Sequence, residues 1–137
     1  MGLIHLDAGV IIGFLDGNDA HHQAAQTMLA EVLRDGHRLA MASSAFAECL
    51  VGPARRSEAE IQTVRRMFER LPISVIPLDL ETAIVAARLR AKHRALRLPD
   101  ALVIATAIED AADQLVTTDR KWPTARVLKL KAAVRHL

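Results

Sequence analysis

Short apolar runs that alternate with longer helical stretches constrain the fold of this sequence more than any other feature. Runs rich in aliphatic and β-branched residues lie at 3–6, 39–42, 73–77 and 115–118, and 127–130 is a fifth candidate. Strands that are apolar on both faces are typical of parallel sheets covered by helices on both sides. The sequence therefore predicts an α/β fold, a three-layer α/β/α sandwich with a short, mostly parallel central sheet of four or five strands.

Capping residues and chain breakers place the helices between these runs. Ser57 and Glu60 form a capping box, and apolar residues follow it at helical spacing. Gly52-Pro53 is expected to end one helix, and Pro99 suits the first turn of another. We expect helices over 8–15, from Asn18 or Asp19 to about 35, from Ser43 or Ser44 to about 51, from 58 to about 71, from Asp79 to about 96, and from Pro99 to about 112.

Composition limits the broad class of protein. The 137 residues are 51% hydrophobic and 25% charged, which fits one globular domain over residues 1–137 and excludes intrinsic disorder. Cys49 is the single cysteine, so no intrachain disulfide forms, and no Cys/His spacing suggests a zinc site. The sequence begins without a signal-peptide pattern and has no apolar run long enough to cross a membrane. We therefore expect a cytoplasmic protein that makes no membrane contact.

Four acidic residues occupy positions where a chain of this class places functional groups. Asp7 follows the first expected strand and Asp119 the fourth, and ligands bind at the carboxyl ends of such strands. Glu48 and Asp100 are lone charges in apolar helical stretches. Taken singly, each has a structural explanation: Asp7 as a helix cap, Asp119 in an Asx turn, Asp100 at a helix dipole, and Glu48 paired with an arginine.

Together, these four carboxylates suggest a metal site. Carboxylates that converge without a cation repel one another and take up protons. A hard divalent cation removes that conflict, and an all-oxygen ligand set suits Mg²⁺ or Mn²⁺ rather than zinc.

A basic segment leads directly into Asp100. Five cationic side chains fall within ten residues, and a phosphate backbone beside an acidic metal site requires such charges. A solvated helix face explains the same run equally well. No aromatic residue interrupts the segment, so base stacking is not expected there. The candidate RNA-binding residues are Arg88, Arg90, Lys92, Arg94 and Arg97.

Two longer motifs show a resemblance to a known family. The stretch Leu-Pro-Asp-Ala-Leu-Val-Ile-Ala-Thr-Ala at 98–107 and Leu-Val-Thr-Thr-Asp at 115–119, with Asp7 and Glu48 before them, resemble the PIN domain. The length resembles the VapC-type toxins of type II toxin–antitoxin pairs. By this resemblance the family's acidic site falls on Asp7, Glu48, Asp100 and Asp119, and Thr117 matches its small hydroxyl residue.

The resemblance implies a metal-dependent endoribonuclease that uses Mg²⁺ or Mn²⁺ to hydrolyse RNA phosphodiester bonds. Asp7, Asp100 and Asp119 are expected to hold metal, and Glu48 either binds metal or orients the attacking water. A VapB-like antitoxin that blocks the acidic site and a homodimer are further implications. An apolar stripe at Val10, Ile11, Phe14 and Leu15 serves that dimer or is buried within one monomer.

Three positions depart from the family pattern. Ala8 stands where a Ser or Thr often follows the first Asp, so one hydroxyl is missing beside the site. Lys121 stands where many relatives have a further acid, and Trp122 replaces the usual Phe. A fifth acidic ligand from this loop is therefore not expected.

Other functions fit the residues less well. A haloacid-dehalogenase-like phosphatase requires Asp-x-Asp after its first strand, and a receiver domain requires an acidic pair there, whereas Asp7 is followed by Ala8-Gly9. The apolar surroundings of Cys49 favour a core thiol over a nucleophile. The alternative from another class is a catalytically inactive PIN-like module that binds RNA or protein, which metal titration would distinguish from the enzyme.

Overall fold

In the computed structural model, which describes residues 2–137, one central sheet of five parallel strands forms the middle layer. Each strand pairs in parallel with its neighbours, in the order β3-β2-β1-β4-β5. The predicted α/β class and parallel sheet are confirmed. The strands are β1 (Leu3–Leu6), β2 (Arg38–Ala42), β3 (Ile73–Ile76), β4 (Gln114–Thr117) and β5 (Ala133–His136).

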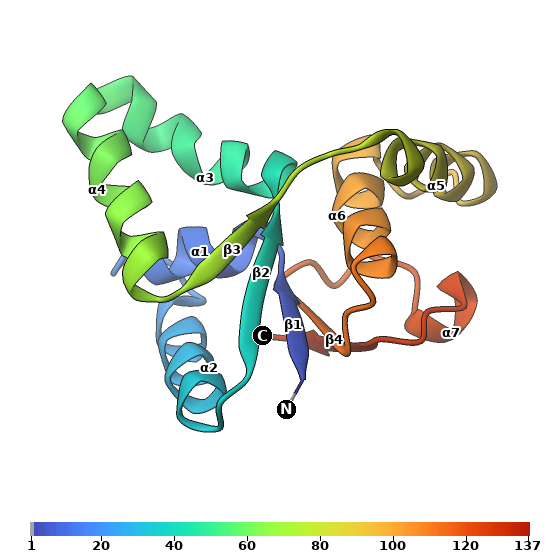
Figure 1. The fold of residues 1–137 in the computed structure, drawn as a ribbon, viewed down its shortest axis with the longest axis horizontal. Helices are drawn as coiled ribbons and strands as arrows, with labels where there is room; N and C mark the ends of the chain where they lie inside the picture. The colour runs from blue at the N-terminus through green and yellow to red at the C-terminus, as the bar shows by residue number, and fades with distance from the viewer. Residues whose placement is uncertain (1) are drawn as a thin grey trace.

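Helices form the two outer layers (Figure 1). Parallel connections are almost always right-handed, so the helices between β1 and β3 lie on one face and those between β3 and β5 on the other. No helix within residues 2–137 is long and apolar enough to cross a membrane. The helices are α1 (Ala8–Leu15), α2 (His22–Arg34), α3 (Ser43–Arg56), α4 (Glu58–Arg70), α5 (Leu80–Lys92), α6 (Leu98–Glu109) and α7 (Ala125–Leu128).

The strand order reverses between β1 and β4. From β1 the chain proceeds outward through β2 to β3, and it then returns to β4 on the other side of β1. Leu6 of β1 is in register with Val116 of β4, so the residues that follow these strands lie together at one edge. Such a reversal opens a crevice at the carboxyl edge of an α/β sheet, where ligands bind.

Aliphatic side chains build the core, as the scarcity of aromatic residues predicts. Leu6, Met41 and Leu115 in the sheet are fully buried, and burying each such side chain contributes about 1.5–3 kcal/mol. Within α1, Val10 and Ile11 are also fully buried. The stripe on α1 is therefore core at these two positions.

The fifth strand lies later than the sequence indicates. Residues 127–130 were expected as a strand, but Val127 and Leu128 belong to the short helix α7. The Thr124 hydroxyl accepts a hydrogen bond from the Val127 N–H at 3.2 Å, and Lys129 ends the helix in the left-handed region at φ 54°. The true strand, β5, instead pairs with β4 from Ala133 onward.

The predicted end of the third helix is also wrong. Pro53 lies inside α3, which continues to Arg56 although the proline has no N–H to donate within the helix, and its ring is buried. Ser43 is the first residue of α3 rather than its cap, and no side chain caps this helix.

Other helix boundaries differ by a few residues. Asp79 caps α5 as predicted, accepting from the Thr82 N–H at 2.9 Å, but the helix ends at Lys92. The expected cap Asp19 instead bonds the His21 N–H, and α2 begins at His22. The helix expected to reach about 112 ends at Glu109.

Candidate acidic site at the carboxyl edge of the sheet

Asp7 directly follows β1 and lies beside the end of β4, where its N–H donates to the Val116 carbonyl at 2.9 Å. It caps α1, with Oδ1 accepting from the Ala8 N–H at 2.8 Å and Oδ2 accepting from the Thr117 hydroxyl at 2.7 Å. Only 8% of the residue is exposed. Burial raises the pKa of Asp7 to about 6, which outweighs the two hydrogen bonds that lower it, and the charges of Asp100 and Glu48 raise it further.

Thr117 connects two of the acidic residues. Its hydroxyl donates to Asp7 and accepts from the Asp119 N–H at 3.0 Å, and the side chain is fully buried. Asp119 Oδ1 then accepts from the Lys121 N–H at 2.8 Å, forming the Asx turn that the sequence allows. One hydroxyl at the end of β4 therefore holds the buried carboxylate and fixes the start of the loop that carries Asp119.

Gly9 allows α1 to approach this same loop. A Cβ atom at this position would lie 2.2 Å from the hydroxyl oxygen of Thr118, a distance at which something must move. Packing thus explains the glycine at this position, because the absence of a side chain lets the first turn of α1 lie against the end of β4.

Asp100 enters the crevice from the first turn of α6. Its carboxylate is largely covered, with 16% of the side chain exposed, and Arg97 Nε lies 3.7 Å from Oδ2. Burial raises the pKa of Asp100, the Trp122 indole N–H lowers it, Asp119 raises it and Arg97 lowers it. Asp100 therefore faces both Asp119 and the cation that precedes its own helix.

Glu48 lies on α3, the helix that follows β2. The apolar sequence neighbours of Glu48 predict apolar surroundings, but the residue is exposed. Partial burial raises the pKa of Glu48, as does Asp100, and Arg97 lowers it. Glu48 thus faces the crevice from its outer rim, within range of the charges on α6.

The four predicted acidic residues therefore meet at one edge of the sheet. Repulsion acts between Asp7 and both Glu48 and Asp100, between Glu48 and Asp100, and between Asp100 and Asp119. Within residues 2–137 no three acidic, histidine or cysteine side chains are gathered tightly enough to hold a metal ion by themselves. The donor set still fits Mg²⁺ or Mn²⁺, because magnesium keeps several waters and commonly uses only one or two protein carboxylates with substrate phosphates.

The predicted basic residues divide between two locations. Arg88, Arg90 and Lys92 are exposed on the second half of α5, and Arg94 is exposed in the turn after it. Arg97 is the member of this set that the structure places beside the acidic residues.

A pocket beside the acidic residues contains two further groups outside the predicted site set. The cavity has a volume of about 400 Å³ and lies between the turn before α6 and the loop after β4. Asp100, Asp119 and Arg97 line it together with Lys121 and Trp122. A sequence signal was available, because both residues follow Asp119 within three positions and both depart from the family pattern.

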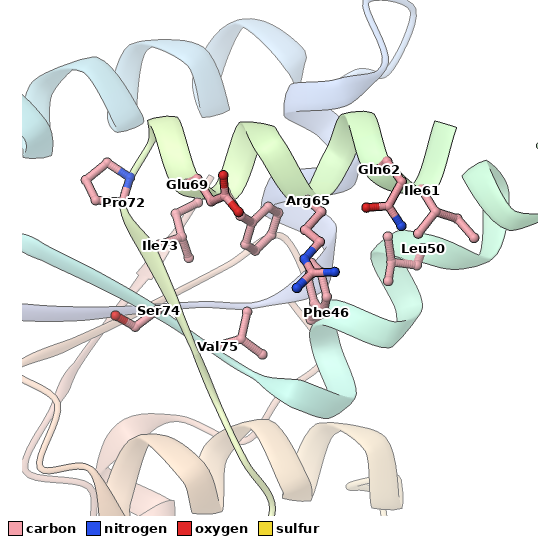
Figure 2. Close-up of a pocket in the computed structure, with 11 residues that line it drawn as sticks. Phe46, Leu50, Ile61, Gln62, Arg65, Glu69, Pro72, Ile73, Ser74 and Val75 are labelled. Atoms are coloured by element: carbon pink, nitrogen blue, oxygen red, sulfur yellow. The ribbon is translucent and has the colours of Figure 1, made fainter. Parts of the chain in front are cut away.

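A larger groove of about 610 Å³ lies between α3, α4 and the edge strand β3 (Figure 2). Apolar side chains from all three elements face it, and Arg65 of α4 extends across it. Among residues 2–137, Glu69 is its one acidic lining residue, and Asp7, Glu48, Asp100 and Asp119 are not among the residues that line it. Its apolar members include Phe46, Leu50, Ile61, Ile73 and Val75.

Cys49 is a core thiol, as the sequence indicates. It is 2% exposed, and its Sγ lies 3.8 Å from the Ala8 carbonyl oxygen. Burial, followed by the charges of Glu48 and Asp7, raises the pKa of the thiol to about 12. The thiol is therefore protonated at neutral pH, which argues against a nucleophilic role.

A parallel sheet whose β1 and β4 carry carboxylates at the switch point defines an α/β protein with an acidic site. The family model of the PIN domain matches residues 4–128. The chain therefore belongs to the PIN domain family.

One named relative and two solved structures are similar to this chain over most of its length. The chain is 28% identical over 120 residues to "Ribonuclease VapC19" of Mycobacterium tuberculosis, covering 86% of this chain and 90% of the relative. The structure of VapBC-1 from nontypeable Haemophilus influenzae matches with a TM-score of 0.72 at 18% identity, covering 98% of this chain and 97% of that chain. VapBC2 from Rickettsia felis, bound to a promoter DNA fragment, matches with a TM-score of 0.71 at 15% identity, covering 98% of both chains.

Proposed function

We propose that this protein is a metal-dependent endoribonuclease that hydrolyses RNA phosphodiester bonds and serves as the toxin of a toxin–antitoxin pair. The observation that carries the proposal is the convergence of four carboxylates at the β1–β4 switch point. A relative that matches most of the chain is named a ribonuclease, and the solved VapC20 of Mycobacterium tuberculosis is described as a sarcin–ricin loop cleaving toxin.

The buried end of the site is suited to holding a metal ion. Asp7, Asp100 and Asp119 would hold Mg²⁺ or Mn²⁺, which when bound supplies a Lewis acid that activates water and offsets charge on the phosphate. Thr117 keeps Asp7 in one orientation by donating to Oδ2, so the other residues meet a fixed carboxylate. Glu48, exposed at the rim, either completes the ligand set or orients the attacking water.

The test is cleavage of a mixed cellular RNA pool by the purified protein with Mn²⁺, with Mg²⁺ and with chelator. Discrete fragments are expected only with metal, and Asp100→Asn should abolish them, because the change removes a charged oxygen ligand while keeping the shape. Asp35→Asn is the matched control, since Asp35 is exposed and precedes the start of β2, at the opposite edge of the sheet from the acidic residues. Metal-independent cutting, or equal cutting by Asp100→Asn, would contradict the proposal and favour the binding-module alternative.

A cognate antitoxin that blocks the acidic site is the partner we propose, and the groove of Figure 2 would hold an apolar segment of the same antitoxin. The solved structures similar to this chain include a toxin–antitoxin complex from Klebsiella pneumoniae. The groove is the larger of the two described above, and apolar side chains dominate its walls. Ile61→Glu should weaken co-purification with the co-expressed antitoxin, whereas Thr63→Glu on the exposed face of α4 should not.

A homodimer is the assembly we propose for the free protein. Several large apolar side chains remain exposed on one chain, as a subunit interface would require. Light scattering should then give twice the mass of the chain. The exposed residues are Ile12, Leu15, Val51, Leu78, Leu80, Ile84, Leu98, Ile108 and Val127.

A further inference from the structure

The pocket beside Asp100 and Asp119 combines opposite charges within one small space. Two carboxylates form part of its wall, and Arg97 and Lys121 supply two cations. Arg97 Nε lies 3.7 Å from Asp100, but its side chain is 79% exposed and free to turn toward another anion. Lys121 is exposed as well, and its backbone N–H is already bonded to Asp119. Neither cation is committed to a buried ion pair.

Trp122 forms the rigid part of the same pocket. It is 7% exposed, and within residues 2–137 its Nε1 has no hydrogen-bond partner. The N–H lies close enough to the Asp100 carboxylate to lower the pKa of that group, although the two do not meet the geometry of a hydrogen bond. Its dipole therefore favours negative charge at this place. An indole N–H buried without a partner is rare and calls for an explanation.

These groups fit a phosphate better than any neutral ligand. Exposed Arg and Lys side chains bind phosphate oxygens without reading the base, and the pocket is large enough for one nucleotide unit. It adjoins two of the carboxylates that would face the bond to be cut. A second phosphate of the same RNA strand would then lie beside these cations and outside the group of carboxylates.

We propose that Arg97 and Lys121, which line this pocket together with Trp122, bind the RNA phosphate next to the one that is hydrolysed. The inference rests on the proposed nuclease function and adds to it a second phosphate subsite, formed by residues outside the acidic set. The subsite fixes the register of the strand by its backbone and carries no base preference of its own.

Trp122 is the only tryptophan in a chain without tyrosine, so its fluorescence reports binding at the pocket directly. The probe is a single-stranded RNA of about ten nucleotides, titrated with chelator and again with Ca²⁺. Saturable change in Trp122 emission is expected. Lys121→Ala and Arg97→Ala should each weaken binding about fivefold, and each should reduce the slope of log affinity against log salt by about 0.7.

Charge-matched controls separate this subsite from general attraction. Lys131→Ala removes an exposed cation that lines a different cavity, beside the start of β4, and should leave affinity within about twofold. Lys121→Glu, which introduces an acid at this exposed position, should weaken binding more than Lys121→Ala does.

The outcomes also separate this inference from the proposed function. Metal-dependent cleavage by the wild type, with Lys121→Ala and Arg97→Ala binding RNA as tightly as Lys131→Ala, would overturn the subsite and leave the nuclease in place. Absence of both RNA binding and cleavage would overturn both. The subsite is supported if Lys121→Ala and Arg97→Ala lower both the affinity for RNA and the cleavage rate while Lys131→Ala does not.

Discussion

The acidic site has two halves that differ in how they are held. Asp7 and Thr117 lie at the ends of adjacent strands, both buried, with a 2.7 Å hydrogen bond between them. Glu48 and Asp100 come from helices, and Glu48 is exposed. Backbone register positions the buried half, whereas helix starts and loops position the rim.

This difference separates what the fold determines from what the loops determine. A carboxylate that follows a central strand cannot move without moving the sheet, so Asp7 is a fixed point for chemistry. Rim groups such as Arg97, on exposed side chains, can adapt to the strand that binds. Catalysis should therefore be most sensitive to Asp7 and the other carboxylates that would hold the metal, and substrate affinity to the exposed cations of the rim.

The largest effect is expected at Asp7. Asp7→Asn removes the buried negative charge and should lower metal-dependent cleavage by more than about 100-fold, because no neighbouring side chain can take its place at the end of β1. The measurement is the initial cleavage rate of RNA at saturating metal. A loss confined to substrate affinity, with an unchanged maximal rate, would place the chemistry at the rim instead.

Thr117→Val should have the next largest effect. The change keeps the shape of the side chain but removes the hydroxyl that orients Asp7 and accepts from the Asp119 N–H. Loss of such a supporting hydrogen bond typically costs about tenfold or more in activity or metal affinity. The maximal rate and the metal concentration at half activity should both change.

Thr106→Val is the matched control for this substitution. Thr106 is equally buried, and its hydroxyl donates to the Leu102 carbonyl within α6, away from the acidic residues. Similar activity losses in the two variants would show that Thr117 acts only through stability.

Much of the buried half could be predicted from the sequence. A short apolar strand ending in Asp7 and another ending before Asp119 imply convergence, provided that the strands are neighbours, and β1 and β4 are paired. Thr117 was identified from the family motif, and the structure adds the reason, a hydroxyl that bonds both acidic segments.

The rim was less predictable because its geometry depends on tertiary placement. Glu48 has apolar sequence neighbours yet is exposed, since helical residues one position apart face different directions. The 127–130 run resembles a strand, but local capping by Thr124 makes it helical. No local pattern reveals that Trp122 lies beside Asp100, because these residues meet only in the folded protein.

The pH dependence of stability gives a smaller and sharper test of the buried half. The folded-state pKa of Asp7 is raised from 3.8 to about 6, so its favourable contribution is complete below the unfolded-state value and is lost as pH rises through about 6. In chelator, the stability of Asp7→Asn relative to wild type should therefore improve by up to about 3 kcal/mol between about pH 4 and pH 8.

Urea unfolding at several pH values measures this shift. The constant cost of replacing a carboxylate by an amide beside Thr117 cancels in the comparison, because it does not vary with pH. Asp35→Asn, at an exposed site, supplies the control curve. A relative stability of Asp7→Asn that falls as pH rises would show that the native state favours the charged form of Asp7.

The smallest effect is expected on α5, where the basic segment lies away from the acidic residues. Arg90 is exposed, and a solvated helix face accounts for it as well as RNA contact does. Arg90→Ala should change RNA affinity by less than about twofold at moderate salt, because Arg90 does not line the pocket and salt screens a solvated charge. The RNA probe is titrated against Arg90→Ala and against Arg97→Ala. Arg97→Ala should weaken binding more. Equal weakening would mean that the RNA path extends from the rim along α5, and that the rim is one end of a longer cationic surface.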